Sequence, residues 1–119
     1  QAMKSIHAGI VKKIGAELQK CSMGSTTFMN GTNRNNGATY QVNCSTNSTT
    51  NANSAYVGIV TTANDKNPWA TANFAVVAGS GYAKGYTRVI RSGNRVNIYS
   101  CWADGCATAN RAFQAIQAE

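Results

Sequence analysis

The sequence predicts an α+β fold in which an N-terminal amphipathic α-helix packs on an antiparallel β-sheet and a short helix ends the chain. Three observations support this prediction. Apolar side chains recur at helical spacing over residues 3–20, and strand-forming segments separated by Gly, Pro and Asn turns follow up to residue 100. Residues 107–119 are rich in the helix formers Ala, Gln and Glu. At 119 residues, the chain is long enough for one domain with its own core.

The N-terminal helix is predicted over residues 3–20. Isoleucine or leucine occupies every fourth position on one face, while lysine, glutamate and glutamine take the other side. Such an apolar face must be covered, and the later strands are the expected cover. No N-cap residue precedes Met3, so we expect an upstream segment to have been removed. The apolar face comprises Ile6, Ile10, Ile14 and Leu18.

Residues 22–54 are predicted to form a long irregular helix-to-sheet loop. The segment is rich in Ser, Thr, Asn and Gly, and its one strand candidate spans residues 39–43. A connection of this length is unusual in a compact domain, which favours a surface feature held in place by a disulfide.

The sheet is predicted over residues 55–100, with strands at 55–61, 73–78, 86–91 and 95–100. The last two strands flank Ser92-Gly93-Asn94 and are typical of a β-hairpin. Because side chains alternate along a strand, one face of this hairpin should be core and the other should be open. Val89, Arg91, Val96 and Ile98 share the predicted core face, and Arg88, Ile90, Arg95, Asn97 and Tyr99 share the opposite face.

Basic residues near this hairpin form the best candidate site for a polyanion. The chain carries eleven Lys and Arg against four Asp and Glu, a net charge of +7, which allows contact with anionic partners. The alternative interpretation is an exposed sheet face kept soluble by arginine. The candidate polyanion-binding residues are Lys84, Arg88, Arg91 and Arg95. Trp69 and Trp102 are interpreted as packing anchors because indole rings bury large areas.

Four cysteines, at positions 21, 44, 101 and 106, allow three disulfide pairings. Proximity in sequence favours Cys21 with Cys44 and Cys101 with Cys106, although the other pairings stay open. No pair has the spacing of a zinc site, so we expect no metal, and disulfides of an exported protein explain the cysteines better. The Cys loop and tail comprise residues 101–119.

Catalytic chemistry is poorly supported, and we expect neither an enzyme nor a cofactor. His7 lies ten residues before Glu17, which is about 15 Å along a helix and too far for an acid/base pair. His7 is therefore interpreted as a helix-surface residue. A secreted nuclease would have to recruit Asp65, Asp104 or Arg88, and it ranks last among the alternatives.

The order of elements resembles the soluble head of a type IV pilin that lacks the hydrophobic half of its long helix. The resemblance begins at AGIVKKIGAELQKCS, includes Asn-Pro-Trp at 67–69 and ends with NRVNIYSCWADGC. It implies a single pilin-like globular domain over residues 1–119 whose N-terminal helix, with Ile6, Ile10, Ile14 and Leu18, mediates assembly.

The family implies a structural subunit of a type IV pilus, with roles in adhesion, twitching motility or DNA uptake. Its expected partners are other pilin subunits in a homopolymeric filament and the pilus assembly machinery in the inner membrane, with DNA or another surface ligand as a further candidate. The membrane would be contacted only through the missing N-terminal segment, and the mature subunit would be extracellular in the pilus. The alternatives are a type II secretion pseudopilin and a secreted basic binding module for DNA or glycans.

Overall fold

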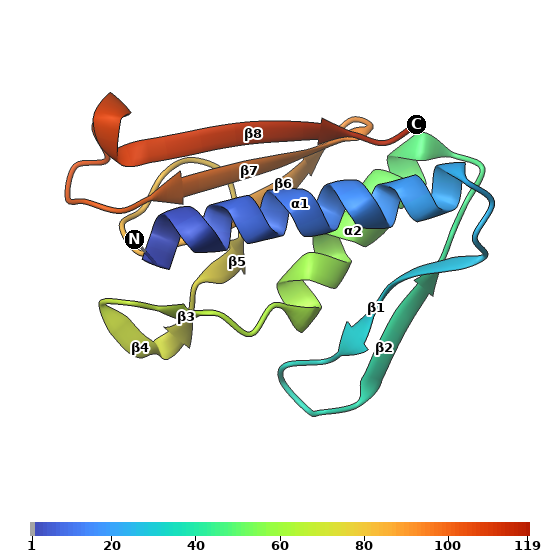
Figure 1. Ribbon diagram of the computed structural model, residues 1–119, viewed down its shortest axis with the longest axis horizontal. Helices are drawn as coiled ribbons and strands as arrows, with labels where there is room; N and C mark the ends of the chain where they lie inside the picture. The colour runs from blue at the N-terminus through green and yellow to red at the C-terminus, as the bar shows by residue number, and fades with distance from the viewer. Residues whose placement is uncertain (1) are drawn as a thin grey trace.

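The computed structural model describes residues 2–119 and has an α+β fold with an N-terminal helix, a second helix and largely antiparallel sheets (Figure 1). In chain order the elements are α1 (Ala2–Ser22), β1 (Thr27–Thr32), β2 (Thr39–Asn43), α2 (Ser48–Thr62), β3 (Lys66–Asn67), β4 (Ala70–Phe74), β5 (Val76–Ala78), β6 (Thr87–Ser92), β7 (Arg95–Cys101), the 3-10 turn η1 (Thr108–Asn110) and β8 (Arg111–Gln117). The main sheet has the order β5-β6-β7-β8, and β1-β2 and β3-β4 form separate hairpins.

Both helices lie on the same face of the main sheet. Figure 1 shows α1 running along the sheet, and its contacts with this sheet are chiefly with β7 and β8. Helix α2 packs beside α1 against β6 and β7, and the β1–β2 hairpin extends from the two helices. Within residues 2–119, no helix lies on the opposite face of the sheet, so the sheet has a covered face and an open face.

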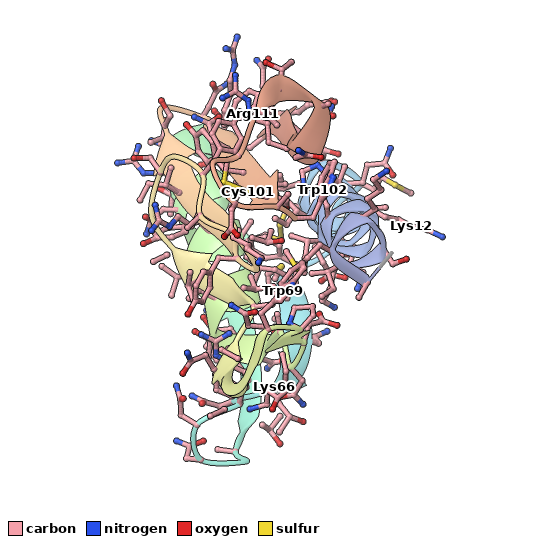
Figure 2. All side chains as sticks on the ribbon, turned by 90° about the vertical axis from the view of Figure 1, so that its left-hand side faces the viewer. Lys12, Lys66, Trp69, Cys101, Trp102 and Arg111 are labelled. Carbon is pink, nitrogen blue, oxygen red and sulfur yellow. A yellow bond between two sulfur atoms is a disulfide. The ribbon has the colours of Figure 1, made fainter. Side chains whose placement is uncertain are left out.

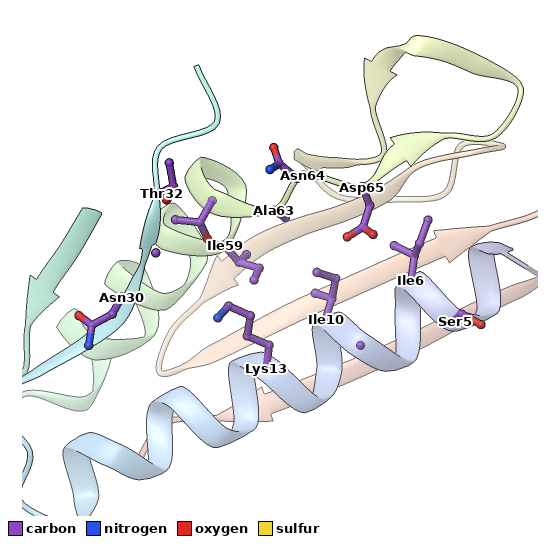
Figure 3. A pocket seen from close by; sticks show the side chains of 13 residues that line it. Ser5, Ile6, Ile10, Lys13, Asn30, Thr32, Ile59, Ala63, Asn64 and Asp65 are labelled. Carbon is purple, nitrogen blue, oxygen red and sulfur yellow. The ribbon is translucent and has the colours of Figure 1, made fainter. Parts of the chain in front are cut away.

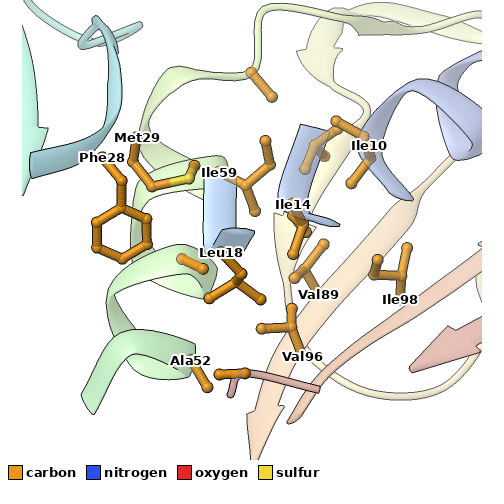
Figure 4. Close-up of a cluster of buried hydrophobic side chains, with 14 residues drawn as sticks. Ile10, Ile14, Leu18, Phe28, Met29, Ala52, Ile59, Val89, Val96 and Ile98 are labelled. Carbon is orange, nitrogen blue, oxygen red and sulfur yellow. The ribbon is translucent and has the colours of Figure 1, made fainter. Parts of the chain in front are cut away.

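The hydrophobic core fills the space between the helices and the sheet (Figure 4). Helix α1 contributes the buried side chains of Ile10, Ile14 and Leu18, as the predicted stripe requires. These meet side chains from α2, the sheet and β1, which include Ala52, Ile59, Val89, Val96, Ile98, Phe28 and Met29. One side of α1 therefore packs against all the other parts of the core.

Three sequence predictions are confirmed at the level of secondary structure. The N-terminal helix forms, and the strand at 39–43 has the bounds of β2. The hairpin β6–β7 pairs Val89 with Ile98 and Arg88 with Tyr99, which places these pairs on opposite faces as predicted. Val89 and Ile98 are fully buried, so their face is the core face.

The strand predicted at 55–61 is wrong, because these residues belong to α2. The Asn47 side chain caps this helix by accepting bonds from the backbone N–H groups of Thr49 and Thr50. Ala52, Ala55 and Ile59 recur at helical spacing and are fully buried, so packing favours a helix although the segment contains β-branched residues. The predicted loop 22–54 accordingly holds a hairpin and the start of a helix.

The predicted short C-terminal helix is also wrong. Residues 108–110 form the turn η1, and β8 pairs antiparallel with β7 from Arg111 to Gln117. This pairing occupies the edge of β7 and directs Ile116 towards the core beside Val96, which outweighs the helix propensity of Ala and Gln. The main sheet also differs from a purely antiparallel one, because β5 pairs parallel with β6.

All four cysteines form disulfides, in the pairings that sequence proximity favours. Cys21 at the end of α1 joins Cys44 just after β2, and their Cα atoms are 5.4 Å apart. Cys101 joins Cys106 and closes a loop that contains Trp102 and Asp104. The first disulfide fixes the β1–β2 hairpin to α1, and the second shapes the connection between β7 and β8.

Candidate functional site

The predicted assembly residues divide between the core and the surface. Ile10, Ile14 and Leu18 are buried in the domain's own core, so they are not accessible to another subunit in this fold. Ile6 is half-buried. The accessible side of α1 is the opposite one, and we call it the bare side of α1: it presents Ser5, Ala8, Lys12, Ala16 and Gln19, all exposed.

Small residues make the bare side of α1 easy to approach. Gly9 and Gly15 flank it, and a Cβ placed on either glycine would meet nothing within 4 Å. Ala8 and Ala16 are exposed on the same side. Another helix could therefore come close to this side without steric conflict.

A groove of about 540 Å³ runs along one flank of α1 (Figure 3). Its apolar part is lined by Ile6, Ile10 and Ile59, from α1 and α2. Lys13 from α1 and Asp65, just before β3, add opposite charges to its lining. Ile10 and Ile59 are buried, so the groove adds the half-buried Ile6 and the exposed charges of Lys13 and Asp65 to the accessible surface of α1.

The four predicted polyanion-binding residues do not form one cluster. Arg88 and Arg95 project from the open face of the sheet, whereas Arg91 pairs with Val96 on the covered face and is exposed only at the hairpin end. Arg88 and Arg91 donate to the backbone oxygens of Ser80 and Gly93, at 3.2 and 3.1 Å.

Lys84 lies apart from the three arginines. Its Nζ is 3.5 Å from Asp104 Oδ1 and 4.8 Å from the centre of the Trp69 ring. Lys84 therefore connects the β3–β4 hairpin to the loop closed by Cys101 and Cys106, and the predicted polyanion set is spread over different surfaces.

An aromatic cluster on the open face was missed by the sequence analysis. The ring centres of Tyr82 and Tyr99 are 5.4 Å apart, and those of Tyr99 and Phe113 are 4.9 Å apart. The Arg111 guanidinium lies 4.7 Å from the centre of the Tyr82 ring. Because residues 107–119 were predicted as a helix, Phe113 and Arg111 could not be placed beside Tyr99. The strand pairing brings Phe113 directly opposite Tyr99.

The tryptophans differ from their predicted role as packing anchors. Trp69 is 52% exposed, so for this residue the prediction is wrong. Trp102 is partly buried, and the Lys4 ammonium lies 5.2 Å from the centre of its ring. Both indoles therefore lie beside a lysine at the end of the molecule where α1 begins (Figure 2).

His7 is not the free surface residue that the sequence predicted. Its Nδ1 is 2.7 Å from Ser100 Oγ, which is in turn 2.7 Å from Thr87 Oγ1. Burial lowers the pKa of His7, because desolvation disfavours the charged imidazolium. Ser100 and Thr87 are fully buried, so the serine hydroxyl is not accessible to a substrate and the chain of hydrogen bonds joins α1 to the sheet.

Glu17 is a buried carboxylate that the sequence analysis treated as solvent-facing. Its Oε1 accepts a hydrogen bond from Met29 N–H at 2.5 Å, and its Oε2 is 2.7 Å from Lys20 Nζ. Met29 has a φ of 57° at the irregular point of the β1–β2 ladder, and its N–H is satisfied by the helix. Burial raises the pKa of Glu17, but the bonds from Lys20 and Met29 outweigh it, so the pKa is lowered.

Arg34 makes a third connection between the hairpin and the rest of the fold. Its Nη1 donates to Ala63 O at 3.1 Å and to Val76 O at 2.6 Å, and its guanidinium lies 4.1 Å from the centre of the Phe74 ring. Arg34 therefore binds the β1–β2 loop to the end of α2 and to β5.

Within residues 2–119, no group of three or more His, Cys, Asp or Glu side chains is arranged to hold a metal ion. In the same range, no helix combines the length and the apolar character that crossing a bilayer demands. Comparison with known proteins found no matching family model, no matching curated protein and no matching solved structure.

Proposed function

We propose that this chain is the globular part of a type IV pilin, a structural subunit of a pilus filament. The observation that carries the proposal is the division of α1 into two sides. One side is buried in the domain's own core, and the bare side is accessible, rich in small residues and flanked by an open groove. A helix that must pack on both its own sheet and neighbouring subunits needs such a surface.

The order of elements supports the same proposal. In this proposal the hairpin β1–β2, attached to α1 by Cys21–Cys44, would correspond to the variable helix-to-sheet region of type IV pilins, and the Cys101–Cys106 loop would correspond to their C-terminal variable region. In this proposal the partners are further copies of the chain in a homopolymeric filament and the assembly machinery in the inner membrane. The subunit is held in that membrane by an upstream segment before assembly and is extracellular in the pilus afterwards.

The experiment that tests the proposal begins with the coding sequence upstream of Met3. The proposal requires a short basic leader, a small-residue cleavage site and about 20 apolar residues that continue the helix. An ordinary secretory signal peptide that ends near residue 1 would overturn it.

A surface substitution then tests the bare side of α1 in the full-length protein. Ala16→Trp places an indole on this side, and Ala115→Trp places the same group on the open face of the sheet, where Ala115 is also exposed. The expected result is loss of filaments from the surface of source cells for Ala16→Trp alone, with the melting temperature of both domains unchanged. Equal assembly of the two variants would contradict the proposal.

A secreted binding module for polyanions is the second candidate function. It is favoured by the aromatic cluster of Tyr82, Tyr99 and Phe113 beside Arg111 on the open face of the sheet. Exposed rings stack on bases, and arginines bind phosphates in a salt-dependent way. Single-stranded DNA binding that weakens at high salt and is lost in Arg111→Ala, but retained in Lys12→Ala, would support it.

A further inference from the structure

Both tryptophans of the chain lie at one end of the molecule, which we call the tryptophan end. It is the end where α1 begins, and Figure 2 views it directly. Trp69 lies in the β3–β4 hairpin and Trp102 in the loop closed by Cys101 and Cys106. Although these residues are 33 positions apart in sequence, the fold brings their elements to the same end.

Lysines join the two tryptophans into one surface. Lys84 Nζ is 4.8 Å from the centre of the Trp69 ring and 3.5 Å from Asp104, which shares the Cys loop with Trp102. Lys4, from the first turn of α1, lies 5.2 Å from the centre of the Trp102 ring. The surface is therefore continuous from the β3–β4 hairpin through the Cys loop to the start of α1.

Cationic side chains outnumber carboxylates at the tryptophan end. Lys66 and Arg111 are exposed on either side of the tryptophans, as Figure 2 shows, and they add to Lys4 and Lys84. The nearby carboxylates are Asp104, which is paired with Lys84, and Asp65, which faces the groove beside α1. The net charge of this end is positive, so it attracts an anionic surface.

Tryptophan beside lysine is the combination that favours a bilayer interface. Indole rings settle at the level of lipid headgroups because their body is apolar and their N–H is polar. Basic side chains are attracted to anionic headgroups. With half of its surface exposed, Trp69 can enter the headgroup layer without any change of fold.

We infer that the tryptophan end rests on the surface of an anionic phospholipid bilayer. The inference depends on the proposed function, in which an upstream membrane segment would lead into α1 at this end. Before assembly, the lysines and tryptophans would hold the globular domain against the headgroups and so fix its orientation.

A bilayer fits this surface better than a nucleic acid does. A base stacks on a free ring face, but lysine ammonium groups lie over the rings of Trp69 and Trp102. In a lipid headgroup layer, by contrast, the indole ring and the lysine ammonium group can both bind at the same depth. The Phe113 ring is 47% exposed on the sheet's open face, where stacking would be easier.

The experiment mixes the purified chain with vesicles of phosphatidylcholine alone or of phosphatidylcholine with phosphatidylglycerol. Because the tryptophans are both at the proposed contact, their fluorescence reports it directly. The expected result is sedimentation with the anionic vesicles only and a blue shift of tryptophan emission, both reduced at high salt. Trp69→Phe and Trp102→Phe variants assign the shift to each ring.

A matched pair of charge reversals tests the location. Lys4→Glu with Lys66→Glu and Lys84→Glu should weaken vesicle binding about 100-fold or more. Lys12→Glu with Arg91→Glu and Arg95→Glu makes the same change of charge at exposed positions elsewhere and should leave most of the binding. Circular dichroism of both variants checks that they fold.

Three results would overturn the inference: no binding to anionic vesicles, equal loss in both triple variants, or vesicle binding without a blue shift. Binding of DNA but not vesicles, lost with the first triple variant, would assign the tryptophan end to nucleic acid instead. The proposed function is tested by a separate measurement, the presence of the chain in filaments. A chain that binds vesicles but is absent from filaments contradicts the pilin proposal, and a chain that forms filaments but ignores vesicles contradicts only this inference.

Discussion

The two faces of the sheet β5–β8 differ sharply although they are built from the same strands. On the covered face, Val89, Val96 and Ile98 are fully buried under α1 and α2. On the open face, Tyr99 is partly buried and Phe113 is 47% exposed. Alternation along β7 and β8 therefore assigns one set of side chains to folding and leaves the other for contacts outside the domain.

The largest expected effect comes from truncating the covered face. Ile98→Ala should lower the free energy of unfolding by about 2–5 kcal/mol, because it leaves a cavity under the helices. Phe113→Ala on the open face removes more atoms but should cost about 1 kcal/mol or less, chiefly its contact with Tyr99. Urea denaturation of both variants measures the difference, and equal costs would contradict the division of the two faces.

The disulfide on the helix side should contribute more than the one in the β7–β8 connection. Removing Cys21–Cys44, with a sequence separation of 23, should cost about 3 kcal/mol by loop entropy. Removing Cys101–Cys106, with a separation of 5, should cost about 2 kcal/mol. Thermal unfolding of the two double Cys→Ser variants ranks them. A larger loss of stability without Cys101–Cys106 than without Cys21–Cys44 would contradict this prediction.

Glu17 should make the covered side sensitive to acid. Glu17→Ala leaves the Met29 N–H without its acceptor and should cost about 1–3 kcal/mol near neutral pH. Because the folded pKa of Glu17 is lowered, its stabilisation is complete above the unfolded glutamate pKa of about 4.3 and is lost as pH falls through the folded value. The free energy of unfolding, measured as a function of pH, should therefore decline less below pH of about 4.3 in Glu17→Gln than in the native protein.

His7 should also make the protein less stable as the pH falls. Its effect should be smaller than that of Glu17 and should begin at a higher pH. Its pKa is lowered on folding, so the unfolded chain binds more protons in the window below about 6.5. Stability should fall as pH decreases from that value towards the folded pKa of His7 and should then level off. Comparing melting temperatures across this window in the native chain and in His7→Gln checks the prediction. An unchanged profile in the variant would show that His7 is not the group responsible.

The elements that could be predicted are those whose local pattern agrees with their tertiary surroundings. Every fourth residue of α1 is apolar on the side that packs on the sheet, and β6–β7 combines alternation with a Ser-Gly-Asn turn. Residues 55–61 and 107–119 were predicted wrongly because their local propensity opposes their packing. In the first, valine and isoleucine belong to a helix with a buried alanine face, and in the second, alanine and glutamine belong to a strand.

The candidate surfaces were predictable only in part, for a similar reason. Arg88 and Arg95 were placed correctly on one face of a hairpin, since strand alternation determines that. Arg111 and Phe113 could not be placed there, because their position depends on β8 pairing with β7. Lys84 was grouped with the arginines by sequence proximity, whereas the structure places it beside Trp69 and Asp104.

The sequence by itself determined the amphipathic N-terminal helix, the β6–β7 hairpin and the favoured cysteine pairs. These depend on spacings of a few residues, or on the short chain separation between paired cysteines, and such local constraints can be read directly. Only the tertiary structure decided that residues 55–61 form a helix and that residues 111–117 form a strand. It also decided that Trp69 lies beside Lys84 and Trp102 beside Lys4 at the same end of the molecule. Those features depend on burial and pairing between segments far apart in sequence, which no local pattern records.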